Sequence, residues 1–207
     1  MTTARKSSRP FATYEAMTPR IEPLPDDEAS PTSLDLLQQV ERALGMVPNL
    51  HRTLAHAPAA LGGYVALTKA LAGGRLSARL REQIAVATAG VNRCDYCAAA
   101  HTLLGKGAGV DADELLRNLD AESSDPNVAQ ILTFVRALIS ERGAVTDAQL
   151  RAVREAGLGD ADLVELVAHV GMNWFTNAFN RLARTEVDFP ALARRLEQHE
   201  ENDRAAQ

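Results

Sequence analysis

The apolar residues of this chain recur every three or four positions over most of its length, which is the period of an amphipathic helix. Thr32 or Ser33 can cap the first helix, and Gly45 stands where a left-handed stop is expected. Pro58 is a favourable first-turn residue and opens the next long segment. Further helices are expected from Ser77 to about Val91, from Cys94 to about Gly105, after Asp111, after Pro126, after Thr146 and from about Asp160 to Glu186.

The pattern contains no convincing alternation of apolar and polar residues, so no β-strand is expected. The fold class is therefore all-α, a bundle of about eight to ten helices. Glu82 is followed twelve residues later by Cys94, and Glu165 is followed at the same spacing by Asn177. This weak echo fits a repeat of two-helix units, and chance explains it about as well.

Three regions follow from the same pattern. Residues 1–31 hold five of the nine prolines without sustained periodicity, so they are expected to form an arm without its own core. Residues 32–190 form the helical domain, and 191–207 form a polar tail expected to be frayed. Within the domain, Asp111 with Glu114 and Thr146 with Gln149 have the spacing of a capping box.

Composition narrows the function classes. The 207 residues are 46% hydrophobic, 24% charged and 4% aromatic, which is typical of a globular helical protein and unlike a disordered chain or a β-barrel. A net charge of −5 argues against a nucleic-acid-binding surface, which needs clustered Lys and Arg. The first fifteen residues have no apolar core of a signal peptide, and no long apolar run follows. We therefore expect a cytoplasmic protein that binds neither nucleic acid nor membrane.

The candidate chemistry lies at the only two cysteines, which are too few for a disulfide scaffold. On a helix, Cys94, Cys97 and His101 fall within a sector of roughly 60°. Cys97 and His101 are four residues apart, so the imidazole is expected to act as the base for the Cys97 thiol. The start of the helix favours a thiolate at Cys94, and its spacing from Cys97 permits a disulfide. Structural zinc is disfavoured because only three ligands cluster.

Glu82 lies about 200° away from the main apolar stripe of the helix after Ser77, which is typical of an exposed charge. Ala85, Val86 and Ala89 nevertheless make this helix apolar on nearly all sides, so the carboxylate can also be buried. A desolvated carboxylate there would serve as a proton relay to a nearby histidine or thiol. The residues alone leave both interpretations open.

The spacing Glu82, eleven residues, Cys94-Asp-Tyr-Cys97, three residues and His101 resembles the signature of the AhpD-like alkylhydroperoxidases, within the carboxymuconolactone decarboxylase superfamily. The resemblance extends from about Val47 to Asn177 and is greatest to a longer, peroxidase-related branch. It implies an AhpD-like helical bundle that assembles as a homo-oligomer, commonly a trimer or hexamer. It also implies that the protein uses no metal and no bound organic cofactor.

The resemblance further implies a role for each residue of the signature. Cys97 would be the peroxidatic thiol, Cys94 the resolving thiol and proton donor, and His101 with Glu82 the proton relay. AhpD itself has an additional relay histidine immediately before the second cysteine, where this chain has Tyr96. A tyrosine of ordinary pKa, near 10, is a poor proton shuttle at neutral pH, so the relay must be shorter or run through water.

The favoured hypothesis is a thiol-dependent peroxidase that reduces alkyl or other hydroperoxides and is recycled by an external dithiol, either lipoyl-type or thioredoxin-like. One alternative is a dithiol–disulfide reductase that serves a partner peroxiredoxin. Another is a decarboxylase or lactone-processing enzyme, although that chemistry does not need paired cysteines. A non-enzymatic helical assembly that senses redox state through its cysteines is the remaining alternative.

Other polar and aromatic residues receive no catalytic role. The scattered histidines His51, His56 and His169 are interpreted as surface or supporting residues. Two sets on the last helix are expected to be structural: Trp174, Phe175 and Phe179 as a core or subunit-contact cluster, and Asn173, Asn177 and Asn180 as capping or bridging amides.

Overall fold

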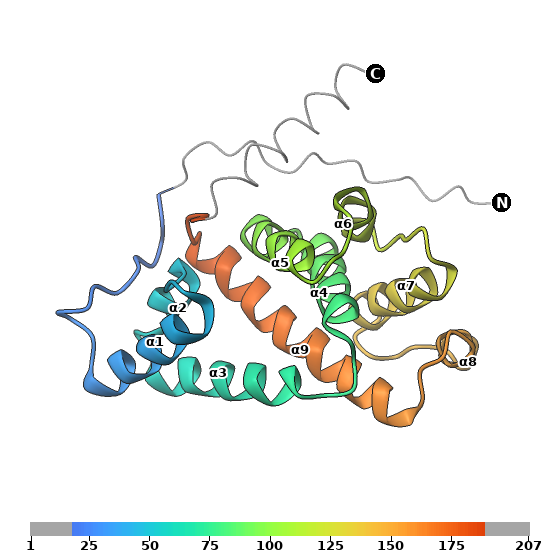
Figure 1. The fold of residues 1–207 in the computed structure, drawn as a ribbon, viewed down its shortest axis with the longest axis horizontal. Helices are drawn as coiled ribbons and strands as arrows, with labels where there is room; N and C mark the ends of the chain where they lie inside the picture. Colours follow the sequence, from blue (N-terminus) through green and yellow to red (C-terminus); the bar gives the residue numbers. More distant parts are fainter. Residues whose placement is uncertain (1–17, 189–207) are drawn as a thin grey trace, which may run out of the picture.

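The computed structural model describes residues 18–188, and within them the fold consists of nine α-helices and no strand, which confirms the all-α prediction. The helices lie in one layered assembly in which α4 and α9 run through the middle (Figure 1). Their bounds are α1 Pro31–Leu44, α2 Asn49–Leu54, α3 Pro58–Ala72, α4 Ala78–Asn92, α5 Asp95–Gly107, α6 Ala112–Leu119, α7 Pro126–Ser140, α8 Asp147–Glu155 and α9 Asp160–Ala183.

Two apolar clusters meet along the central helices. One joins α4, α7, α8 and α9, and its fully buried members include Ile84, Leu132 and Leu166. The other joins α1, α2, α3 and the start of α5, and it contains both cysteines and Tyr96. Helix α4 therefore contacts neighbours on nearly all sides, as its apolar sequence predicted.

Most helices begin at or next to the residues that the sequence predicted, but the cap of the first helix lies at a different residue. Ser77 and Asp125 accept backbone N–H bonds at the starts of α4 and α7. The first helix is capped by Ser30, not by Thr32 or Ser33 as predicted, and Pro31 occupies its first turn. Ser33 is instead fully buried and donates to the Ala55 carbonyl at 2.8 Å, so tertiary contact decided its role.

Of the two predicted capping boxes, one is confirmed. Thr146 and Gln149 bond each other's backbone N–H groups at the start of α8. At the start of α6, Asp111 accepts from the Asp113 N–H, but Glu114 does not return to the cap. The Glu114 carboxylate instead accepts from the side chains of Ser123 and Ser124, and this holds the loop before α7.

The last helix is shorter than predicted, because Arg184 adopts a left-handed conformation and the Thr185 N–H bonds back to Asn180. The following residues turn toward α2, where Asp188 Oδ2 accepts from the Asn49 N–H at 2.7 Å. Because Pro48 offers no capping side chain, this distant carboxylate caps α2.

The described part of the N-terminal arm lies against its own chain. Arg20 and Ile21 donate their N–H groups to the Ala183 carbonyl, and Leu24 is buried against the second apolar cluster. Residues 18–30 thus cover α2 and the end of α9. The rest of the predicted arm, and all of the predicted tail 191–207, lie outside the described residues.

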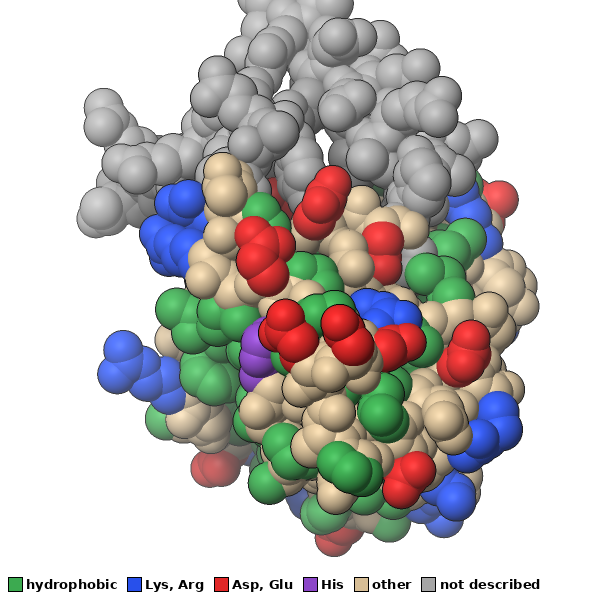
Figure 2. Space-filling model, turned by 90° about the vertical axis from the view of Figure 1, so that its left-hand side faces the viewer, with side chains coloured by type: hydrophobic (Ala, Val, Ile, Leu, Met, Phe, Trp, Pro, Cys, Tyr) green, Lys and Arg blue, Asp and Glu red, His purple; other side chains and the backbone are tan. Residues whose placement is uncertain are grey.

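The surface carries interspersed charges and some exposed apolar groups. Figure 2 shows acidic side chains among hydrophobic ones on the described part of the α1 side, without a continuous basic patch. No helix among residues 18–188 has both the length and the apolar character needed to cross a membrane. Trp174 is 54% exposed and Phe175 38%, so the core interpretation of these two residues is wrong, and the subunit-contact interpretation stays a prediction.

Candidate redox-active site

The two cysteines lie together at the start of α5. Cys94 is the N-cap residue, and Cys97 stands in the first turn, so their sulfur atoms come within 2.7 Å of each other. Both thiols are free, and only 1% of Cys94 and 2% of Cys97 is exposed. This arrangement brings the dithiol to the distance at which a small movement would form a disulfide.

The surroundings of the two sulfurs shift their pKa values in opposite directions. Burial by itself would raise the pKa of the Cys97 thiol, but hydrogen bonds from Cys94 and Asn180 and the charge of His101 lower it to about 7. The Cys94 thiol, by contrast, has a pKa well above the ordinary range, because it is hydrogen-bonded to Cys97 and buried. The prediction of a Cys94 thiolate at the helix start is therefore wrong, because Cys94 is the donor of the pair.

Glu82 and His101 form the second part of the site. Glu82 from α4 lies 2.8 Å from His101 Nδ1 on α5, and the two side chains are 21% and 18% exposed. Burial would lower the pKa of His101, but the Glu82 carboxylate outweighs it and raises the pKa. Glu82 is thus largely buried and paired. His101 acts on Cys97 through its charge, while its short contact is to Glu82.

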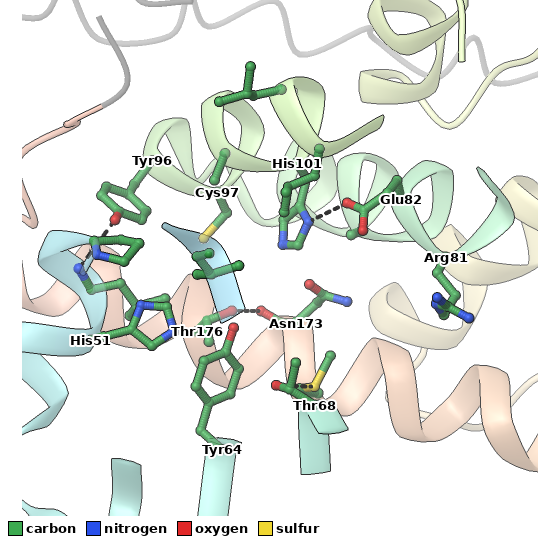
Figure 3. A pocket seen from close by; sticks show the side chains of 18 of the residues that line it. His51, Tyr64, Thr68, Arg81, Glu82, Tyr96, Cys97, His101, Asn173 and Thr176 are labelled. Carbon is green, nitrogen blue, oxygen red and sulfur yellow. Dashed lines mark hydrogen bonds and ion pairs between the residues drawn. The ribbon is translucent and has the colours of Figure 1, made fainter. Parts of the chain in front are cut away.

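The Cys97 sulfur faces a cavity of about 320 Å³ that α5, α4, α9 and the N-terminal helices enclose. Figure 3 shows Cys97 between Tyr96 and His101 on one wall, with His51 and Tyr64 on the opposite wall. Cys94 does not line the cavity, so Cys97 is the sulfur that a small molecule can reach. The remaining lining is mostly apolar and includes Leu44, Met46, Leu50, Ala85, Ala100, Leu103, Leu104 and Met172.

Tyr96 has a structural position instead of a place in the proton relay. Its hydroxyl accepts from the Leu50 N–H at 3.2 Å, which ties α5 to α2. Burial raises the pKa of Tyr96, so the phenol stays protonated at neutral pH. Figure 3 shows its ring pointing away from His101. Glu82 and His101 are therefore paired with each other, and Tyr96 is engaged elsewhere.

Sequence reasoning missed several residues of the site. Asn180 donates its side-chain N–H to the Cys97 sulfur at 3.2 Å, although it was expected only to cap or bridge. His51 and His169 both line the cavity, and burial lowers the pKa of His51 to about 4. Tyr64 faces the same space, and burial raises its pKa to about 12. The asparagines were visible as a polar row on an otherwise apolar helix, whereas the histidines had no periodic signal.

No group of three or more His, Cys, Asp or Glu side chains within residues 18–188 is arranged to hold a metal ion. Cys97 and His101 lie on one wall of the cavity, and Glu82 pairs with Nδ1 of the imidazole. The ionisable groups of the site are thus arranged as a dithiol beside a proton-carrying pair.

Residues 58–139, which include the whole Glu82 to His101 constellation, match the carboxymuconolactone decarboxylase family. A search of the curated proteins finds no matching sequence. Three solved structures share the fold. An uncharacterized peroxidase-related protein from Silicibacter sp. TM1040 is 21% identical with a TM-score of 0.70, over 83% of this chain and 94% of that one.

The second structure is an uncharacterized peroxidase-related protein with an alkylhydroperoxidase AhpD core, from Ralstonia eutropha JMP134. It is 25% identical with a TM-score of 0.69, over 87% of this chain and 94% of that one. The third is the debrominase Bmp8, which is 17% identical with a TM-score of 0.72, over 86% of this chain and 96% of that one. The segment 58–139, which contains both cysteines, is therefore similar to the carboxymuconolactone decarboxylase family, and the chain shares the helical fold of these solved structures.

Proposed function

We propose that this chain is a thiol-dependent peroxidase that reduces alkyl hydroperoxides through a Cys94–Cys97 dithiol–disulfide cycle. The observation that carries the proposal is the position of Cys97. Its sulfur has a lowered pKa, lines a largely apolar cavity, and lies 2.7 Å from the second thiol. A thiolate that organic molecules can reach, with a resolving thiol behind it, is what peroxide reduction by cysteine requires.

In the first step, the Cys97 thiolate attacks the terminal oxygen of the hydroperoxide. A sulfur–oxygen bond forms, the oxygen–oxygen bond breaks, and Cys97 becomes a sulfenic acid. The departing alkoxide needs one proton. His101, which lines the same cavity, is suited to supply it, because Glu82 raises the pKa of His101 and favours the protonated imidazole. Glu82 then holds the ring in place while the proton is replaced from solvent.

In the second step, the Cys94 sulfur attacks the sulfenic sulfur of Cys97. The disulfide forms, and the hydroxyl group leaves as water with the proton of the Cys94 thiol. An external dithiol must then reduce the disulfide, giving up two electrons and two protons. The raised pKa of Cys94 suits this order, since the thiol keeps its proton until the sulfenic acid is present.

The cavity supports an organic substrate. Its volume of about 320 Å³ lies at the lower end of the range of small-molecule sites, about 300–1,000 Å³. The apolar rim formed by Leu44, Met46, Leu103 and Leu104 is 39–48% exposed, so an alkyl group can enter without desolvating charge. Hydrogen peroxide has no alkyl group, so apolar walls would not strengthen its binding.

The proposal is tested by following cumene hydroperoxide consumption with dihydrolipoamide as reductant. Wild type, Cys97→Ser and Cys94→Ser are compared. We expect turnover in wild type, none in Cys97→Ser, and in Cys94→Ser a single oxidation that leaves a trappable sulfenic acid on residue 97. Equal turnover in wild type and Cys97→Ser would reject the peroxidase.

Further assays on the same protein samples separate the alternatives. A wild-type protein that exchanges disulfides rapidly with dihydrolipoamide and yet ignores peroxide would be a dithiol–disulfide reductase. Consumption of a carboxylated lactone substrate that survives complete thiol alkylation would indicate decarboxylase or lactone chemistry. The homo-oligomeric state, expected to be a trimer or hexamer, is measured on the same samples by light scattering.

A further inference from the structure

Helix α9 brings two asparagine side chains to the Cys97 sulfur. Asn180 donates its Nδ2–H to Cys97 Sγ at 3.2 Å, and Asn177 lies three residues earlier on the same side of the helix. Asn180 is 3% exposed and Asn177 is fully buried. We call these two residues the amide pair. A buried amide needs a partner for each polar atom, so its orientation is informative.

The orientation of Asn177 is fixed from α4. Its Oδ1 accepts from Asn92 Nδ2 at 2.9 Å, and this assigns the oxygen to the side away from the sulfur. The Nδ2 of Asn177 is consequently buried and has no hydrogen-bond partner of ordinary length. It is near enough to help lower the pKa of Cys97. A buried donor without a partner is costly unless it faces a negative charge.

The other cysteine lacks such donors from α9. The Cys94 thiol donates to Cys97, and its sulfur accepts only a long bond of 3.4 Å from the Cys97 N–H. Cys97 therefore receives hydrogen bonds from Cys94 and Asn180, while Cys94 gives one away. The part of this asymmetry that Asn180 supplies comes from α9, since both sulfurs are almost fully buried at the start of α5.

We propose that the amide pair stabilises negative charge on the Cys97 sulfur and thereby selects Cys97 over Cys94 as the reacting thiolate. The inference rests on the proposed function only for the role of Cys97. Fixed neutral donors suit this task, since they stabilise a charge in a buried site without reorganising when it forms. Unlike a lysine, they also add no further charge beside the cavity.

The test measures the pH dependence of iodoacetamide labelling at Cys97, resolved from Cys94 by peptide mass spectrometry. Asn180→Ala removes the donor, and Asn180→Leu removes it while keeping the volume. A hydrogen bond to a charged group corresponds to about 1–2 pH units, so the Cys97 midpoint should rise by that amount in both variants. Labelling of Cys94 should gain relative to Cys97.

Asn118→Ala is the matched control. Asn118 is also fully buried, but it lies on α6, where its amide donates to Glu114 and to the Glu122 carbonyl. Its variant should keep the wild-type Cys97 midpoint. An unchanged midpoint in folded Asn180→Ala or Asn180→Leu overturns the proposal, because a purely structural asparagine would not move the titration of the thiol.

A measurement on the unmutated chain covers the case in which both variants fail to fold. The side-chain amide resonances of Asn180 should titrate with the Cys97 midpoint, and this titration should vanish in Cys97→Ser. Amide resonances that ignore the Cys97 titration overturn the proposal. A peroxide-inactive wild type whose midpoint still depends on Asn180 rejects the proposed function and keeps this inference, so the two failures are distinguishable.

Discussion

The lowered pKa of Cys97 predicts how far the reaction rate of this thiol falls when the pH is lowered. With a pKa of about 7, the thiol is half ionised at pH 7. An ordinary thiol with a pKa of about 8.5 would be about 3% ionised there, so the structure supplies roughly a fifteen-fold gain in thiolate. Lowering the pH from 8.5 to 5.5 should reduce the thiolate from about 97% to about 3%, a drop of roughly thirty-fold in rate.

The assay is stopped-flow or quenched labelling of Cys97 by iodoacetamide between pH 5 and pH 9, with the urea-unfolded chain as reference. The rate should level off above pH 8 in the folded protein and keep rising in the unfolded one. Only the midpoint is used, because burial slows the absolute rate equally at every pH. A folded midpoint at 8.5 or above, which would give about a five-hundred-fold drop over the same range, refutes the reasoning.

Three further predictions follow from single substitutions. Gly90→Ala should destabilise the fold by about 2 kcal/mol or more in urea unfolding. The reason is that the added Cβ would overlap the Leu119 carbonyl oxygen where α4 crosses α6. An unchanged midpoint of urea unfolding would contradict this close approach of the two helices. Because Glu82 raises the pKa of His101, their contribution to stability is complete below the unfolded-state pKa of about 6.5 and is lost as pH rises through the folded value. Glu82→Gln should therefore cost more unfolding free energy at pH 5.5 than at pH 8.5, and the reverse order would contradict the ion pair. Ala100→Trp should narrow the cavity and lower the turnover of cumene hydroperoxide far more than that of hydrogen peroxide, and equal losses would contradict an apolar substrate site.

Local signals in the sequence were sufficient for most helix boundaries. Ser77, Pro58, Pro126 and Thr146 mark helix starts because their geometry or side chains satisfy the first backbone N–H groups within a few residues. Such interactions are short-ranged, so neighbouring residues determine them. Where the deciding partner was distant, prediction failed: Ser33 was drawn to the Ala55 carbonyl, and Glu114 to the loop at Ser123.

The same division holds for the site. The spacing of Cys97 and His101 follows from the helical period, and the sequence by itself determined that these two share a face of α5. Cys94 was expected on the same face, but it is the N-cap residue and does not line the cavity. Only the tertiary structure decided that Glu82 is paired with His101 instead of exposed, because α4 had to pack against α5 with that face inward.

Tertiary packing also decided the chemistry of the individual sulfurs. Helix position favoured a thiolate at Cys94, but Asn180, eighty-three residues beyond Cys97 in sequence, donates to Cys97 instead. His51 likewise reaches the cavity from α2 without any motif that links it to the cysteines. The sequence determined the helices and the reactive residue types, since these depend on neighbours along the chain. The folded arrangement decided which thiol receives a hydrogen bond from α9 and which lines the cavity, since both depend on atoms that the chain brings together from far apart.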